Sequence, residues 1–171
     1  MAFWKAVVQD KSNFLERVLA LIEGAGYPYC VIGGVAVNAY ADPVVTQDLD
    51  IVLAIEDLPA ARELMAREFR VEEFEHSLNV YDPGSRLQVQ IQRDPRLSEI
   101  LPRARRETVM DLDLPVAAPA DLLRLKVEAA LEPTRRASKR QKDLADISRL
   151  IENFPELQSA LPASIARLLL K

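Results

Sequence analysis

The stretch YCVIGGVAVNAYADPVVTQDLDIVLA, residues 29–54, decides the fold of this chain. Its first four residues are apolar or aromatic and predict a short buried strand, which Gly33-Gly34 ends in a tight turn. Residues 35–40 predict a short helix behind that turn. Residues 48–54 predict a second strand, with Asp48 and Asp50 on one face and Leu49, Ile51 and Leu53 on the other. The centre of the fold is therefore expected to be strand, turn, helix and strand.

Sequence patterns outside this stretch predict further strands and several helices. Tight turns such as Pro83-Gly84 separate neighbouring strands and favour a mixed sheet over a doubly wound parallel one. Ser12 and Asp57 are candidate N-caps. The fold class is therefore α/β of the α+β kind, a small mixed sheet flanked by helices, with C-terminal helices. The predicted helices are 12–23, 57–68, 120–131, 137–153 and one or two within 155–170, and the predicted strands are 70–74, 78–81, 86–92 and an edge strand at 114–117.

Length and composition set the broad class of the protein. With 171 residues, 49% hydrophobic and 28% charged, the chain has the composition of a soluble globular protein that can bury a core without disulfides. We expect a core at residues 1–118 and a helical part at 119–171 packed on it as one structural unit. The single cysteine, Cys30, excludes an intramolecular disulfide and favours the cytoplasm. No run approaches the ~20 apolar residues of a membrane span, so no membrane partner is expected.

Charge is unevenly distributed along the chain. The net charge of -4 argues against a general affinity for nucleic acid. Residues 103–142 nevertheless carry 10 basic and 6 acidic side chains, and no acid interrupts the run of Arg135, Arg136, Lys139, Arg140 and Lys142. This basic run fits either a phosphate-bearing ligand or a solvated helix face.

Glycines and paired acids carry the chemistry of the central stretch. Gly33 and Gly34 allow backbone N–H groups to approach an anion closely. Asp48 and Asp50 project from one face of a strand about 6–7 Å apart. Two carboxylates at that spacing can hold Mg²⁺ or Mn²⁺, which keeps coordination places for phosphate oxygens. Together these residues predict a site for a nucleoside triphosphate with its metal.

The same residues resemble a known signature. VIGGVAVNAY (31–40) followed by TQDLDI (46–51) is similar to the signature of the nucleotidyltransferase superfamily. DLLRLK (121–126) and KDLADI (142–147) narrow the resemblance to the AbiEii/AbiGii-type nucleotidyltransferases, which include toxins of toxin–antitoxin systems. The resemblance spans residues 27–152 and implies a small mixed sheet flanked by helices, with a C-terminal helical part.

The resemblance also implies roles for individual residues. Gly33 and Gly34 would bind triphosphate, and Asp48 and Asp50 would be the catalytic residues that hold the metal. Thr46 would either brace the acidic strand or touch phosphate. Lys126 would neutralise phosphate charge. Asp146 would be either a structural partner of Lys126 or a direct participant, and Lys142 with Asp143 could equally form an exposed helix pair.

Two positions depart from the family pattern. A third carboxylate is common on a later strand, and here the matching position is Gln88 or Gln90. An amide cannot take a proton from an attacking hydroxyl. An arginine is common two residues before Thr46, where this chain has Val44. Phosphoryl-type transfer depends mainly on positioning and charge stabilisation, so two acids and a metal could still suffice.

The sequence therefore predicts a metal-dependent enzyme that moves a nucleoside monophosphate from a nucleoside triphosphate to an acceptor. The acceptor could be an RNA 3′ end, a protein or a small molecule, and the resemblance adds a toxin role with an antitoxin partner. RNA would be guided by Arg135, Arg136, Lys139 and Arg140. The alternative is a degenerate module of the same fold that binds nucleotide or a partner without turnover.

Overall fold

The computed structural model describes residues 3–170, whose strands form one seven-stranded mixed sheet. Strand order is β3-β4-β5-β2-β1-β7-β6. The pairs β2–β5 and β1–β7 are parallel, and the other four neighbouring pairs are antiparallel. The mixed sheet that the turns predicted is confirmed. The strands are β1 (Tyr29–Ile32), β2 (Asp48–Leu53), β3 (Arg70–Glu73), β4 (Ser77–Tyr81), β5 (Gln88–Gln92), β6 (Arg105–Val109) and β7 (Leu112–Val116).

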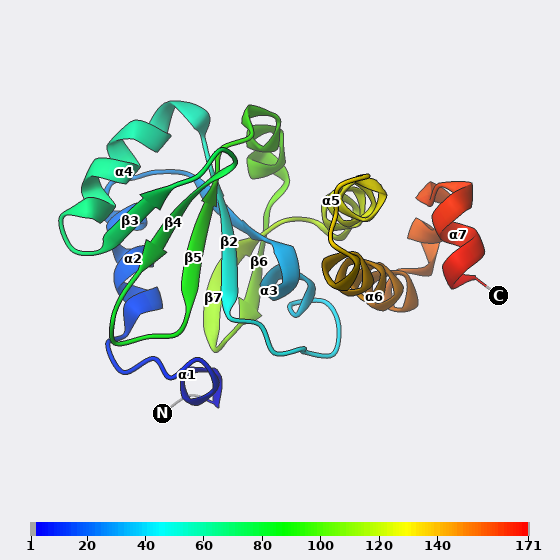
Figure 1. Ribbon diagram of the computed structural model, residues 1–171, viewed down its shortest axis with the longest axis horizontal. Coiled ribbons are helices and arrows are strands. Elements are labelled where there is room, and N and C mark those ends of the chain that lie inside the picture. The colour runs from blue at the N-terminus through cyan, green and yellow to red at the C-terminus, as the bar shows by residue number, and fades with distance from the viewer. Residues whose placement is uncertain (1–2, 171) are drawn as a thin grey trace.

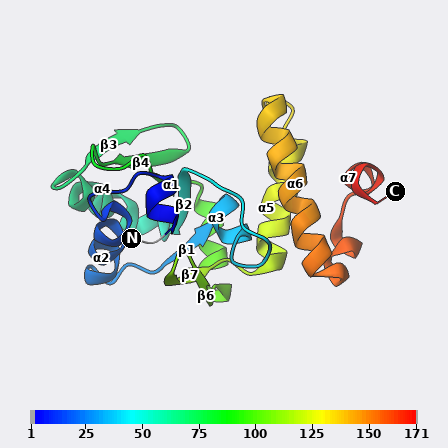
Figure 2. The same ribbon diagram turned by 90° about the horizontal axis from the view of Figure 1, so that it is seen from below.

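Helices flank the sheet on two sides (Figure 1). α2 and α4 lie against the half made by β3, β4 and β5, whereas α3, α5, α6 and α7 follow one another beyond β2 (Figure 2). α5 and α6 lie side by side. No helix within residues 3–170 is both long and apolar enough to cross a membrane. The α-helices are α1 (Phe3–Val7), α2 (Phe14–Gly24), α3 (Gly33–Val37), α4 (Leu58–Ala66), α5 (Pro119–Leu131), α6 (Ala137–Asn153) and α7 (Ala163–Leu169), and the 3-10 helices are η1 (Ile55–Asp57), η2 (Pro95–Arg103) and η3 (Pro155–Ala160).

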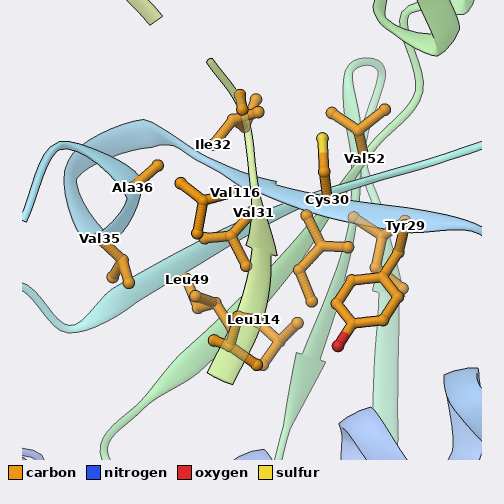
Figure 3. Close-up of a cluster of buried hydrophobic side chains, with 14 of the residues drawn as sticks. Tyr29, Cys30, Val31, Ile32, Val35, Ala36, Leu49, Val52, Leu114 and Val116 are labelled. Atoms are coloured by element: carbon orange, nitrogen blue, oxygen red, sulfur yellow. The ribbon is translucent and has the colours of Figure 1, made fainter. Parts of the chain in front are cut away.

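The hydrophobic core fixes the end of β1, where the glycine turn begins. All four residues of β1 are buried, because β1 lies between β2 and β7 with apolar side chains on both faces. Val31 lies among Leu49, Leu114 and Val116 (Figure 3). A strand enclosed in this way holds the residues that follow it in a defined place.

One strand was missed, and two predictions, the edge position of the strand at 114–117 and the Ser12 cap, are wrong. β6 was not predicted, because its sequence RRETV lacks an alternating pattern. Its pairing with β7 means that β7 is an interior strand rather than an edge. The first turn of α2 is capped by Asp10 rather than Ser12, since Asp10 Oδ1 accepts the backbone N–H of Phe14 at 3.1 Å.

Candidate active site

Gly33 is the residue on which the site geometry depends most. It follows the last residue of β1 with φ +72°, a conformation that side chains with a Cβ rarely adopt. A Cβ built on Gly33 would lie 2.2 Å from Asp50 Oδ2, because β1 and β2 pair Ile32 with Asp50. Gly33 therefore brings the backbone turn directly against the acidic strand.

Gly34 has a different environment. The atom nearest to a Cβ at this position is Thr46 Oγ1, at 4.0 Å, which is an ordinary contact. Gly34 is not among the residues that line the main cleft, whereas Gly33 is. Of the two glycines predicted to bind triphosphate, the structure brings Gly33 to the cleft.

Asp48 and Asp50 lie on one face of β2 at a cleft of about 550 Å³. The Asp48 side chain is 35% exposed, and Lys139 Nζ lies 4.0 Å from its Oδ2 atom. Asp50 lies deeper, where Gln92 Nε2 donates a hydrogen bond to its Oδ1 atom at 2.9 Å. The predicted pair is thus brought together at one wall of a cavity, with one carboxylate near solvent and one largely enclosed.

The protein environment disfavours the charged form of Asp50. Burial, helped by the neighbouring Asp48 charge, raises the pKa of Asp50 to about 6 against the opposing effects of Lys126 and the Gln92 hydrogen bond. A carboxylate held in this way gains from any cation that enters the cleft beside it.

This raised pKa predicts a pH-dependent stability. Folded Asp50 binds its proton more tightly than in the unfolded chain, so the free energy of unfolding should fall as pH rises from about 4 to 6. The loss should be on the order of 2–3 kcal/mol. Asp50→Asn should therefore be more stable than wild type at pH 7.5 in urea titrations, and nearly equal to it at pH 4. Asp111→Asn, in the exposed β6–β7 turn, is the control, and equal pH dependence in wild type and Asp50→Asn would contradict the assignment.

β5 supplies amides beside the acids. Gln88 pairs with Asp48 and Gln90 with Asp50, as expected if one of them takes the position of a third acid. Gln90 lines the cleft but Gln88 does not. Gln92, which sequence reasoning missed, lines the cleft and contacts Asp50 directly. The sequence does contain a signal for Gln92, because the period of two in QVQIQ places it on the same face as Gln90.

Thr46 lies behind the acidic strand rather than in the cleft. Its Oγ1 atom is 3.3 Å from the backbone N of Asp48 and 3.4 Å from the Asp48 carbonyl oxygen. The side chain lines a separate, largely apolar groove of about 380 Å³. Of the two roles left open, the geometry matches bracing of the acidic strand.

Lys126 lies between the cleft and a buried group of acids on α6. Lys126 Nζ is 2.6 Å from Asp146 Oδ2 and 3.4 Å from Asp143 Oδ1, and its side chain is 14% exposed. Asp146 does not line the cleft, so its contacts match those of a structural partner of Lys126. The exposed pair suggested for Lys142 and Asp143 is wrong for Asp143, which is buried against Lys126 and Arg135, although Lys142 is exposed.

Arg149 connects this group of acids to the glycine segment, and sequence reasoning did not identify it. Its guanidinium donates to Asp146 Oδ1 at 2.8 Å and to Asn38 Oδ1 at 2.7 Å, and it also contacts the Asp42 carbonyl oxygen. Asn38 directly follows α3. The only sequence signal was the i, i+3 spacing from Asp146.

The basic run does not act as one surface. Arg135 and Lys139 line the cleft, and Arg135 is paired with Asp143 at 2.8 Å. Arg140 donates to the carbonyl oxygens of Ala130 and Glu132 and so caps the end of α5. Arg136 and Lys142 are exposed. The run is therefore not a set of five free cations, because folding provides partners for Arg135, Lys139 and Arg140.

The donor set at the cleft fits a hard divalent cation that shares its ligands with a substrate. Within residues 3–170, no group of three or more histidine, cysteine or acidic side chains could hold a metal. Asp48 and Asp50 can supply two carboxylate ligands. Mg²⁺ is commonly bound by one or two carboxylates together with water and substrate phosphates. The two acids therefore suit a metal that arrives with a triphosphate.

Comparison with known proteins shows the fold but not a family. No protein-family model matches the sequence, and no curated protein matches it. ANT(2'')-Ia, solved in complex with adenylyl-2''-tobramycin, is 14% identical, with 91% of this chain and 96% of that chain covered and a TM-score of 0.62. An antigenic nucleotidyltransferase-like protein from Paracoccidioides brasiliensis is 18% identical, with 85% and 77% covered and a TM-score of 0.56.

A third solved structure agrees with these two. The lincosamide antibiotic adenylyltransferase LnuA, in its lincomycin-bound form, is 13% identical, with 83% of this chain and 97% of that chain covered and a TM-score of 0.55. At such low identity these likenesses show the fold alone. The chain has a nucleotidyltransferase-like fold, as predicted.

Proposed function

We propose that this protein is a metal-dependent nucleotidyltransferase that transfers a nucleoside monophosphate from a nucleoside triphosphate to an acceptor, with release of pyrophosphate. The observation that carries the proposal is the approach of Gly33 to Asp50 at the wall of the cleft. That approach requires glycine and places a backbone turn beside two carboxylates. If Gly33 only had to form a turn, it would not need to lie this close to Asp50.

Each residue at the cleft has a role in this proposal. Asp48 and Asp50 would hold Mg²⁺ or Mn²⁺, which supplies charge stabilisation at the reacting phosphate. The Gly33 turn would face the triphosphate, and Lys126 would neutralise phosphate charge from α5. Lys139 and Arg135 line the same cleft and would add positive charge to its mouth. Positioning and charge of this kind account for most of the catalysis in phosphoryl-type transfer.

A thermal melt tests the nucleotide site. Millimolar Mg²⁺ with a nucleoside triphosphate should raise the melting temperature, because ligand that binds only the folded state stabilises it by about 2.7 kcal/mol at a hundredfold excess over Kd. Asp48→Asn and Asp50→Asn should each remain folded but lose this shift. Asp113→Asn, on the exposed side of β7, is the control. If metal and nucleotide leave the melting temperature of wild type unchanged, the proposal is wrong.

A second candidate is a nucleotide-binding module without turnover. The observation that favours it is Gln90, which occupies the position beside Asp50 where a proton-accepting acid would be useful. This alternative predicts the same thermal shift without formation of pyrophosphate. Pyrophosphate release measured with the four common triphosphates and a cell extract as the source of acceptors therefore distinguishes it from the enzyme.

RNA as a partner now has less support than the sequence suggested. Arg140 is engaged with the end of α5, Arg135 pairs with Asp143, and Lys139 lies 4.0 Å from Asp48. Of the four named cations, only Arg136 lacks such a partner among the described residues. An RNA chain guided by this segment would meet few free cations outside the cleft.

On the sequence resemblance alone, we extend the proposal to a toxin that an antitoxin protein would restrain. Induced expression in a bacterial host should then arrest growth, because transfer to a cellular acceptor would continue without control. The same expression of Asp48→Asn should permit growth at the rate of an empty-vector culture. Equal growth of both cultures at matched protein levels would exclude the toxin role and leave the nucleotidyltransferase proposal in place.

A further inference from the structure

We propose that the acceptor's nucleophile is an oxyanion already ionised at neutral pH, a phosphate or a carboxylate, rather than a hydroxyl group. This inference rests on the proposed function and deepens it by naming the acceptor class. It comes from the side chains that surround Asp48 and Asp50 in the cleft.

The side chains beside the two acids offer no proton acceptor to a nucleophile. A hydroxyl nucleophile must lose its proton during attack, and a positioned base normally receives it. The residues of β5 that face the acids are amides, and an amide does not serve as that base. Asp48 and Asp50 are assigned to the metal.

The other carboxylates that line the cleft are engaged by basic side chains or lie at its edge. Asp94 accepts three hydrogen bonds from the Arg96 guanidinium, one at 2.7 Å, and these bonds lower the pKa of Asp94. Asp94 also lies four residues beyond the residue paired with Asp50, roughly 13 Å along an extended chain. Asp143 is bound by Arg135 and Lys126.

Two further carboxylates and one imidazole line the cleft, and none is placed as a base. Glu128 pairs with Arg124 at 3.2 Å. Glu132 is exposed at the end of α5 and accepts a hydrogen bond from Thr134. His76 lies in the β3–β4 loop with its side chain 85% exposed, two strands away from β2. Adjacent strands are about 4.8 Å apart, so His76 is roughly 10 Å from the acidic strand.

The polar groups beside Asp50 also suit an anionic acceptor. An acid beside Asp50 would repel an anionic acceptor, whereas Gln90 and Gln92 present neutral N–H donors. Gln90 has no side-chain hydrogen-bond partner within residues 3–170, so its amide is free for a ligand, while Gln92 uses one N–H on Asp50. Lys139 adds a partly exposed ammonium group to the same cleft, 4.0 Å from Asp48 Oδ2. Donors and a cation without a base are what an oxyanion requires.

The reaction balances without a base. An oxygen of the phosphate or carboxylate attacks the α-phosphorus, and a new P–O bond forms. The bond from the α-phosphorus to the bridging oxygen breaks, and pyrophosphate leaves with the electron pair. No proton leaves the acceptor. The product is a phosphoanhydride in the first case and an acyl-nucleotide anhydride in the second.

The experiment uses the full-length protein, Mg²⁺ and the four triphosphates labelled at the α-phosphate. The acceptor pool is a small-molecule extract, divided into an untreated half and a half treated with alkaline phosphatase that is then removed. A labelled product lost after phosphatase treatment indicates a phosphate acceptor. A product that survives this treatment but is cleaved by hydroxylamine indicates a carboxylate. A product that survives both, or label at the 3′ hydroxyl of total RNA in a parallel reaction, would overturn the inference.

Failure of the proposed function and failure of the oxyanion inference give different results. If the nucleotide gives no thermal shift, the nucleotide site itself is wrong. If the shift is present but neither pool nor RNA acquires label, the oxyanion inference is overturned and the binding module remains.

Four variants test the acceptor class and the absence of a base. Gln90→Glu should lower transfer to the oxyanion acceptor by about tenfold or more, because it places a like charge beside the nucleophile. Gln158→Glu adds the same charge at an exposed position outside the cleft and should leave the choice between acceptors as in wild type. His76→Gln and Glu132→Gln should retain transfer. Complete loss in either of them, with the melt unchanged, would identify a base and overturn the inference.

Discussion

Gly33→Ala is expected to lose about a hundredfold in nucleotidyl transfer and about 1–3 kcal/mol in the free energy of unfolding. The loss of stability follows from φ +72°, which costs an alanine on that order. The loss of activity follows from the new methyl group, which would overlap Asp50 Oδ2 and force the carboxylate away. A displacement of about 1 Å at a reacting centre can cost a hundredfold. Urea unfolding and pyrophosphate release measure the two effects separately.

Gly34→Ala is the matched control for this substitution. Gly34 lies in α3 without a left-handed backbone, and its new Cβ would meet only Thr46 Oγ1 at 4.0 Å. Alanine is favoured over glycine in a helix by about 0.5–1 kcal/mol, so stability should stay equal or rise. If Gly33→Ala is as stable and as active as Gly34→Ala, the close approach to Asp50 is not what the site depends on.

The features predicted correctly from the sequence are those set by local patterns. The strand at residues 29–32, the turn at Gly33 and the acids of β2 lie within 22 residues, and each depends on alternation or on glycine. The helix at 137–153 was predicted with the observed bounds because its apolar residues repeat at helical spacing. Local rules of this kind need no knowledge of distant partners.

The features that were missed depend on contacts between distant segments. Arg149 and Asn38 are 111 residues apart, and no pattern in either segment indicates that they meet. Asp143 looks like part of an exposed helix pair until Lys126 and Arg135 are placed around it. β6 exists because β7 pairs with it across a two-residue turn at Met110 and Asp111, where both φ values are positive without glycine. Pairing and burial of this kind are decided by the whole fold.

The buried ion pairs around Lys126 give the second prediction with a large effect. Lys126→Met should reduce the free energy of unfolding by about 3 kcal/mol, because it removes the cation from two buried carboxylates. The value falls at the lower end of the usual range, since Asp143 keeps Arg135 and Asp146 keeps Arg149. Lys142→Met, exposed on α6, should change stability by less than about 0.5 kcal/mol.

A double variant separates the structural role of Lys126 from its proposed role at the nucleotide. Adding Asp146→Asn to Lys126→Met removes one of the two buried carboxylates that have lost the Lys126 cation and should restore about 1–2 kcal/mol of stability. Nucleotide affinity should not return, because the cation proposed to face the triphosphate is still missing from the cleft. Urea unfolding and the nucleotide-dependent thermal shift, measured on both variants and on Lys142→Met, report the two roles independently. Recovery of the thermal shift together with stability would mean that Lys126 serves the fold alone, and the phosphate contact would then fall to Lys139 and Arg135.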